Sequence, residues 1–178
     1  MTAGGPPLRP RYSLTDHNGR DVTEDDFRGR YQLIFFGFTH CRMVCPRALS
    51  KLTEVLDGLG ELADQIQPLY ISVDPERDTP DVMRAFLEQD YPKFLGLTGS
   101  QEASEAARTD FRVFTGRGDD PEDPEGYAVP HTALTYLLDP AARYLTHFPD
   151  VVEADRMSDR LKELVTTGAP ALHNQVRL

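Results

Sequence analysis

The chain has few cysteines, a shortage of basic residues and no long apolar run. Its 178 residues include two cysteines, and 19 Lys or Arg stand against 29 Asp or Glu, giving a formal net charge of -10. This balance argues against nucleic acid as a partner, because phosphate contacts need clustered Lys and Arg. With 39% hydrophobic residues, the composition and length suit a globular protein with one substantial core.

Membrane and export signals are also lacking in the sequence. No stretch approaches the roughly 18 consecutive apolar residues of a membrane-spanning helix. Residues 1–7, MTAGGPP, lack the basic and then apolar pattern of a signal peptide. Two possibilities stay open on composition: a cytosolic protein, or an exported one whose export or anchor segment is absent from this sequence.

The order of patterns predicts one α/β domain with irregular ends. We expect residues 1–11, rich in Gly and Pro, to be a flexible N-terminal segment, residues 12–167 to be the folded domain and residues 168–178 to be a loosely held tail. Within the domain, residues 12–22 predict a β-hairpin turning at Asn18-Gly19. The apolar run at 31–38 predicts a strand covered on both faces.

Strands and helices then alternate along the chain. We expect a second strand at 69–73, a hairpin of 134–138 and 144–148, and a long acidic loop at 115–130. Helices are expected from Pro46 to about 60, from Pro80, from Ser100 to about 111 and over about 154–165. This alternation predicts a central sheet flanked by helices. Asp16, Asp21, Asp25 and Asp26 are interpreted as surface charge, and the acidic loop as solvated.

Cys41 and Cys45 lie where the first apolar strand leads into a helix. A disulfide between them would close too small a loop to stabilise the fold appreciably, so the pair invites a chemical explanation. If Pro46 begins the helix, Cys45 is its N-cap and Cys41 lies in the loop. The helix N-terminus and Arg42 would favour thiolates there. Two soft sulfur ligands select copper(I) first and zinc second.

A third ligand is needed, and the histidines are the candidates. They are His17, His40, His131, His147 and His173. His40 adjoins Cys41, and neighbouring side chains tend to point apart. His131 precedes a core strand, and in an α/β sandwich the chain that enters this strand passes beside the first helix. A Cys, Cys, His set suits copper in both oxidation states. Taken singly, such residues are more commonly idle buried thiols and packed or surface histidines.

Four motifs in order resemble the Sco/SenC copper proteins, over about Tyr12 to Val165. The motifs are 36–46, containing both cysteines, 72–80 (SVDPERDTP), 97–100 (LTGS), and His131 ahead of 136–140 (YLLDP). The resemblance implies a thioredoxin-like sheet flanked by helices, with the N-terminal β-hairpin as an extension. It also implies that Cys41, Cys45 and His131 bind copper(I) and copper(II).

The functional role implied by the resemblance is assembly of the binuclear copper site of cytochrome c oxidase subunit II. The protein would be a copper metallochaperone or, alternatively, a thiol–disulfide oxidoreductase keeping that subunit's cysteines reduced. Another copper chaperone or a thiol reductant would be a further partner. The family also implies a membrane anchor and a domain on the periplasmic or exported side.

Two departures from the family pattern bear on the site. Arg42-Met43 stands where the family usually has Pro-Asp, and Pro130 stands where it has Asp. The C-x-x-x-C spacing differs by one residue from the C-x-x-C of dithiol reductases, which disfavours the oxidoreductase role without excluding it. A simple dithiol reductase also has no evident use for His131. A peroxidase with Cys41 or Cys45 as its reactive thiol is a weaker alternative, because nothing singles out one cysteine.

Overall fold

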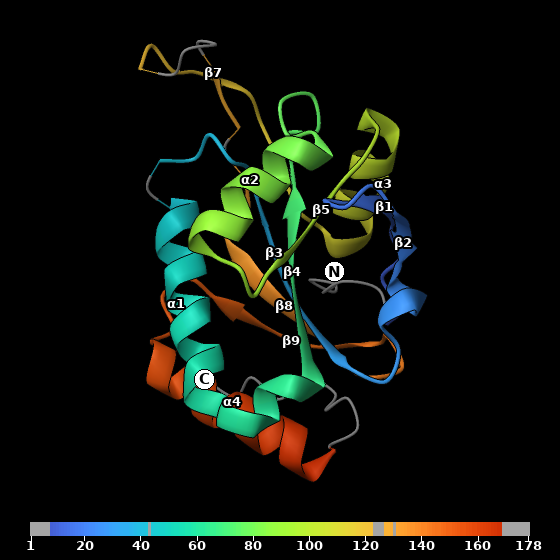
Figure 1. Ribbon diagram of the computed structural model, residues 1–178, viewed down its shortest axis with the longest axis vertical. Helices are drawn as coiled ribbons and strands as arrows, with labels where there is room; N and C mark the ends of the chain where they lie inside the picture. Colours follow the sequence, from blue (N-terminus) through green and yellow to red (C-terminus); the bar gives the residue numbers. More distant parts are fainter. Residues whose placement is uncertain (1–7, 43, 123–126, 130, 169–178) are drawn as a thin grey trace, which may run out of the picture.

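The computed structural model describes residues 8–42, 44–122, 127–129 and 131–168. These form a mixed α/β fold with a seven-stranded sheet in the order β2-β1-β5-β4-β3-β8-β9, flanked by four α-helices (Figure 1). The elements are β1 (Ser13–Asp16), β2 (Asp21–Thr23), η1 (Glu24–Phe27), β3 (Tyr31–Gly37), α1 (Val44–Leu59), η2 (Gly60–Gln65), β4 (Ile66–Ser72), α2 (Pro80–Asp90), β5 (Leu95–Thr98), α3 (Gln101–Phe111), β6 (Gly118–Asp119), β7 (Tyr127–Ala128), β8 (Leu134–Leu138), β9 (Tyr144–Pro149) and α4 (Ala154–Thr167).

Strand β3 is the centre of the sheet. It pairs in parallel with β4 and antiparallel with β8, and all seven of its residues are buried. Because strand side chains alternate, Leu33 and Phe35 pack with α1, α2 and α4, whereas Ile34 and Phe36 pack with α3 on the opposite face. Figure 1 shows the same division of the helices between the two faces. The prediction of a strand covered on both sides is confirmed.

The N-terminal hairpin is also confirmed, and it extends the sheet. Strand β1 pairs antiparallel with β2 and with β5. The interpretation of Asp16 as surface charge is wrong, since its exposed fraction is 0%. Its carboxylate accepts the backbone N–H groups of Asn18 and Arg20, at 2.8 and 3.0 Å, and so closes the hairpin turn. A turn that needs acceptors for its own N–H groups explains why a carboxylate is buried there.

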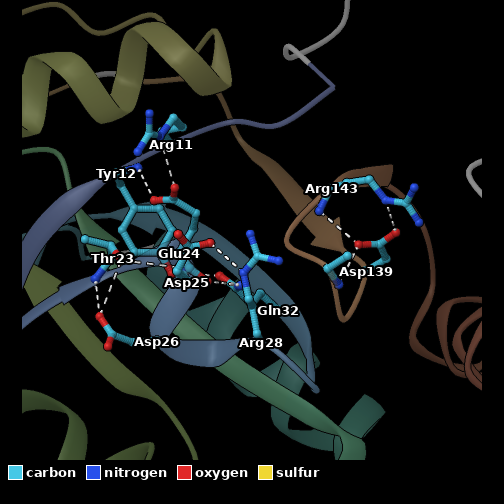
Figure 2. Close-up of polar contacts among 11 residues, drawn as sticks. Arg11, Tyr12, Thr23, Glu24, Asp25, Asp26, Arg28, Gln32, Asp139 and Arg143 are labelled. Carbon is cyan, nitrogen blue, oxygen red and sulfur yellow. Dashed lines mark hydrogen bonds and ion pairs between the residues drawn. The ribbon is translucent and has the colours of Figure 1, made fainter.

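A polar cluster lies at the amino end of β3, opposite the end that leads to the cysteines. In Figure 2 the buried Glu24 accepts hydrogen bonds from the Tyr12 backbone N–H and the Arg11 guanidinium, at 3.0 and 3.2 Å. The amide of Gln32 donates to the Glu24 carbonyl, and Tyr12 donates from its hydroxyl to Gln32. The cluster therefore fixes the start of β3 to the hairpin extension.

Several predicted boundaries are corrected. Helix α1 begins at Val44 rather than at Pro46, so Cys45 is its second residue and not its N-cap. Pro46 still fits, because the first four N–H groups of a helix have no intrahelical acceptor. The short strand β5 was not predicted, and β6 and β7 pair within the expected loop 115–130. None of the helices in the described ranges has the length and apolarity to cross a membrane.

Candidate metal centre

The two cysteines carry thiols and lie at the junction between β3 and α1. The backbone N–H of Cys41 donates to the Phe38 carbonyl at 3.2 Å, which turns the chain back after the strand. The Cys41 sulfur in turn accepts the backbone N–H of Cys45 at 3.3 Å, satisfying one of the open donors at the start of the helix. Cys45 is fully buried, whereas Cys41 is half-buried.

The electrostatics of Cys45 differ from the expectation of a ready thiolate. A hydrogen bond with the Cys41 side chain, followed by burial and the charge of Cys41, raises the pKa of Cys45 above its ordinary value. The Phe38 backbone and the Tyr70 side chain lower that pKa by less. Two sulfur atoms in contact cannot both ionise easily in a buried place, so Cys45 holds its proton until a cation replaces it.

His131 presents a nitrogen atom that is ready to act as a ligand. Its Nδ1 lies 3.0 Å from the Val129 carbonyl, which can only accept, so Nδ1 carries the hydrogen and Nε2 carries the lone pair. Nε2 is buried, and no hydrogen-bond partner for it exists in the part of the chain that the structure describes. Metal-binding histidines are commonly held in this way through their other nitrogen.

Phe38 connects the histidine with the cysteine loop. Its ring meets the His131 ring edge-on at 5.8 Å between centroids, and its backbone bonds with both cysteines. The structure therefore brings Cys41 and Cys45 together and places His131 against the residue that holds them. Within the described ranges, however, no three His, Cys, Asp or Glu side chains lie close enough to form a complete metal site.

The loop before the cysteines is held by a buried carboxylate. Asp78 is 0% exposed and accepts from the Thr39 backbone N–H at 3.1 Å, the Thr39 hydroxyl at 2.5 Å and the Ser72 hydroxyl at 2.7 Å. Burial raises the pKa of Asp78, although hydrogen bonds from Thr39 and Ser72 oppose that rise. The motif at 72–80 therefore supports the motif that contains the cysteines, a role that the sequence did not reveal.

A buried ion pair in the same motif supports Phe38. Arg77 Nε lies 2.5 Å from the Asp74 carboxylate, and both side chains are almost fully buried. The Arg77 guanidinium lies over the Phe38 ring, 5.9 Å from its centroid. Ser72 also accepts the Asp74 backbone N–H at 3.0 Å. This arrangement fixes the aromatic ring that the His131 imidazole contacts.

Arg42, between the two cysteines in the chain, pairs with carboxylates of the acidic loop. Its guanidinium lies 2.6 Å from the Asp120 carboxylate and 3.6 Å from Glu122. The interpretation of the acidic loop as merely solvated is therefore wrong for Asp120, whose side chain is mostly buried, whereas the Glu122 side chain is solvated. Because two carboxylates share the positive charge and Arg42 is 46% exposed, its effect on the thiols is reduced. The other departures from the family pattern, Met43 and Pro130, lie outside the described residues.

Two thiols at the amino end of a helix and an oriented imidazole, on a mixed sheet flanked by helices, agree with the resemblance to the Sco/SenC proteins seen in the sequence. The sequence model of the SCO1/SenC family matches residues 1–166, and the chain belongs to this family.

Known relatives are similar over most of this chain. The "SCO2-like protein" of Rickettsia felis is 39% identical over 77% of the chain, which covers 67% of that relative. The human "Protein SCO1 homolog, mitochondrial" is 40% identical over 82% of the chain. Since only 48% of the human protein is matched, the chain spans about half of that relative.

A solved structure of a relative has the same fold. Bradyrhizobium japonicum ScoI with copper bound is 37% identical, with a TM-score of 0.78 over 88% of this chain and 99% of that one. The predicted thioredoxin-like fold, a central sheet flanked by helices, is therefore confirmed.

Proposed function

We propose that this protein is a copper metallochaperone that binds copper(I) and copper(II) through Cys41, Cys45 and His131. The observation that carries the proposal is the buried Nε2 of His131, which has no hydrogen-bond partner among the described residues and lies beside the loop that holds two contacting thiols. A relative 37% identical to this chain has been solved with copper bound. Two sulfur atoms and one imidazole suit copper in either oxidation state.

The residues of the chain prepare the site in different ways. The Val129 carbonyl fixes the His131 tautomer, so the lone pair of Nε2 is available without rearrangement of protons. The thiols of Cys41 and Cys45 must give up their protons when the metal enters, so binding should weaken in acid. Copper is here the cargo, and its release to a recipient needs ligands that can exchange.

The proposed recipient is the binuclear copper site of cytochrome c oxidase. Proteins of the Sco family are involved in copper binding for the assembly of this oxidase. We propose subunit II as the partner that receives the copper, and another copper chaperone or a thiol reductant as a second partner. The proposed location is the periplasmic or exported side of a membrane.

A second candidate function is thiol–disulfide exchange with the oxidase subunit. The contact between the Cys45 backbone N–H and the Cys41 sulfur favours it, because the two thiols are already adjacent. In that case both cysteines would keep the subunit's thiols reduced, and His131 would have no necessary part.

Titration of the reduced protein with copper(I), in competition with a chelator, tests the proposal. We expect one copper per chain and the loss of both reactive thiols in a thiol assay. The double variant Cys41→Ala/Cys45→Ala should lose high-affinity binding, whereas His147→Ala, which removes a histidine on β9, should bind as the unaltered protein does. Undiminished affinity in the double variant would rule out the thiol site.

A further inference from the structure

Tyr70 is a fully buried tyrosine in the middle of β4. Its ring lies between Phe35, at 6.3 Å and 8° between ring planes, and Phe86, at 6.0 Å and 25°. Its hydroxyl is buried, and among the described residues none gives it a hydrogen bond of regular geometry. A buried hydroxyl without a regular partner costs about 1–3 kcal/mol, so its presence calls for an explanation.

The hydroxyl of Tyr70 lies beside the thiol of Cys45, above Gly37. A Cβ atom on Gly37 would come within 2.5 Å of the Tyr70 oxygen and 2.8 Å of the Cys45 sulfur. The absence of a side chain at Gly37 therefore leaves the space in which these two atoms meet. The Tyr70 and Cys45 side chains interact there, in an arrangement looser than a regular hydrogen bond.

We propose that Tyr70 is a positioning residue of the metal centre, whose hydroxyl donates a hydrogen bond to the Cys45 sulfur when that sulfur is reduced or bound to copper. The metal-bound part of this proposal rests on the proposed function, whereas the redox part needs only the two cysteines. In the metal-free reduced pair the Cys45 thiol gives its own hydrogen to the Cys41 sulfur, which leaves the Cys45 lone pairs for Tyr70. When copper displaces that hydrogen, the same sulfur becomes a charged and stronger acceptor, whereas a disulfide sulfur is the weakest acceptor of the three.

This hydrogen bond favours the reduced pair over the disulfide. In the reaction with a dithiol such as dithiothreitol, the Cys41–Cys45 S–S bond breaks and accepts two electrons and two protons. The dithiol gives them up and closes its own disulfide. Tyr70 takes no part in this transfer, but it stabilises the Cys45 sulfur on the reduced side only. Removing its hydroxyl should therefore shift the equilibrium toward the Cys41–Cys45 disulfide.

The test compares Tyr70→Phe with Tyr136→Phe, which removes a hydroxyl from another buried tyrosine of the same sheet. Each protein is equilibrated with mixtures of reduced and oxidised dithiothreitol, and its free thiols are counted. We expect the equilibrium constant for reduction to fall about tenfold in Tyr70→Phe, equivalent to about 30 mV, and to stay within twofold in Tyr136→Phe. Circular dichroism checks that both variants fold.

The copper(II) form gives a second measurement. Loss of a hydrogen bond to a ligating sulfur should move the sulfur-to-copper absorption band of Tyr70→Phe to longer wavelength, with no shift in Tyr136→Phe. Identical redox equilibria and identical spectra in the two variants would show that Tyr70 serves packing alone. Failure of the unaltered protein to bind copper would reject the proposed function, while the redox comparison would still decide the role of Tyr70.

Discussion

At the residue scale, His131 and Cys45 differ in how ready each is for the proposed metal. The imidazole is fixed by the Val129 carbonyl and offers a lone pair without further change. The Cys45 thiol has a raised pKa because it bonds with Cys41 and is buried, so its proton must be displaced. Of the proposed ligands, the imidazole is therefore preorganised, and the thiol of Cys45 would need a metal to stabilise its charged form.

This difference predicts an unequal effect of His131→Ala on the two copper states. Copper(II) favours nitrogen together with sulfur, so its affinity should fall on the order of 100-fold, whereas copper(I), which accepts two thiolates, should lose about tenfold or less. Competition titrations in each oxidation state measure both losses. Thiol–disulfide exchange needs only Cys41 and Cys45 and should stay within twofold of the unaltered rate.

Complementation in cells that lack this protein then separates the two functions. If copper delivery is the function, His131→Ala should fail to restore the oxidase, and the matched variant His147→Ala should restore it. Full restoration by His131→Ala would favour the thiol–disulfide role instead.

At the element scale, the segment between β4 and α2 controls the loop between β3 and α1. Asp78 accepts three hydrogen bonds from Thr39 and Ser72, and Thr98 donates to the Asp78 carbonyl at 2.6 Å. The buried carboxylate thus holds the segments that follow β3 and end β4, and the backbone carbonyl of the same residue holds the end of β5. Holding these segments in place is a structural role of the SVDPERDTP motif that is separate from metal binding.

Asp78→Ala should lower the free energy of unfolding by about 3 kcal/mol, since it leaves buried donors on Thr39 and Ser72 without an acceptor. Asp81→Ala is the matched control, because the Asp81 side chain is 87% exposed and pairs with Arg84 at the surface. Its cost should stay below about 1 kcal/mol. Urea unfolding of both variants measures the difference, and equal costs would contradict a supporting role for Asp78.

The loss of unfolding free energy in Asp78→Ala should depend on pH, in a direction that the pKa of Asp78 decides. Because burial raises the pKa of Asp78 in the folded state, the folded protein binds this proton more tightly than the unfolded chain does. The contribution of Asp78 to stability is full below the ordinary carboxyl pKa and declines as the pH rises through the raised value. The difference in unfolding free energy between the unaltered protein and Asp78→Ala should therefore be larger in acid than at neutral pH.

At the scale of the whole molecule, the site joins the two faces of the sheet. Cys45 packs with α1, α2 and α4 on one face, whereas Phe38 packs with α3 on the other, and Cys41 contacts both clusters. A metal that binds the thiols and His131 therefore links parts of both halves of the core. Binding to the folded state alone must stabilise the entire domain.

Copper(I) at about 100 times its dissociation constant should stabilise the reduced protein by about 2.7 kcal/mol, which raises Tm by about 5–10 °C for a domain of this size. Oxidation to the Cys41–Cys45 disulfide should remove this effect, because a disulfide offers no thiolate. Scanning calorimetry with and without copper measures the shift. An equal shift in oxidised protein, or in Cys41→Ala/Cys45→Ala, would indicate binding elsewhere.

The sequence by itself determined the features that depend on local pattern. The run at 31–38 is apolar at nearly every position, which is typical of a strand covered on both faces. Asn18-Gly19 likewise specifies a hairpin turn. Spacing and motif were enough to single out Cys41, Cys45 and His131 as candidates. Their joint role as metal ligands stays a prediction.

Tertiary structure alone decided the features that depend on distant segments. Whether Asp16 is buried depends on the turn that it closes and on the neighbouring strand β5, and the partners of Asp78 lie 39 and 6 residues away in the chain. Tyr70 meets Cys45 only because β4 pairs with β3 in one register, above a glycine. A sequence pattern records which side chains are apolar or reactive, but strand register and loop closure decide which of their atoms come into contact.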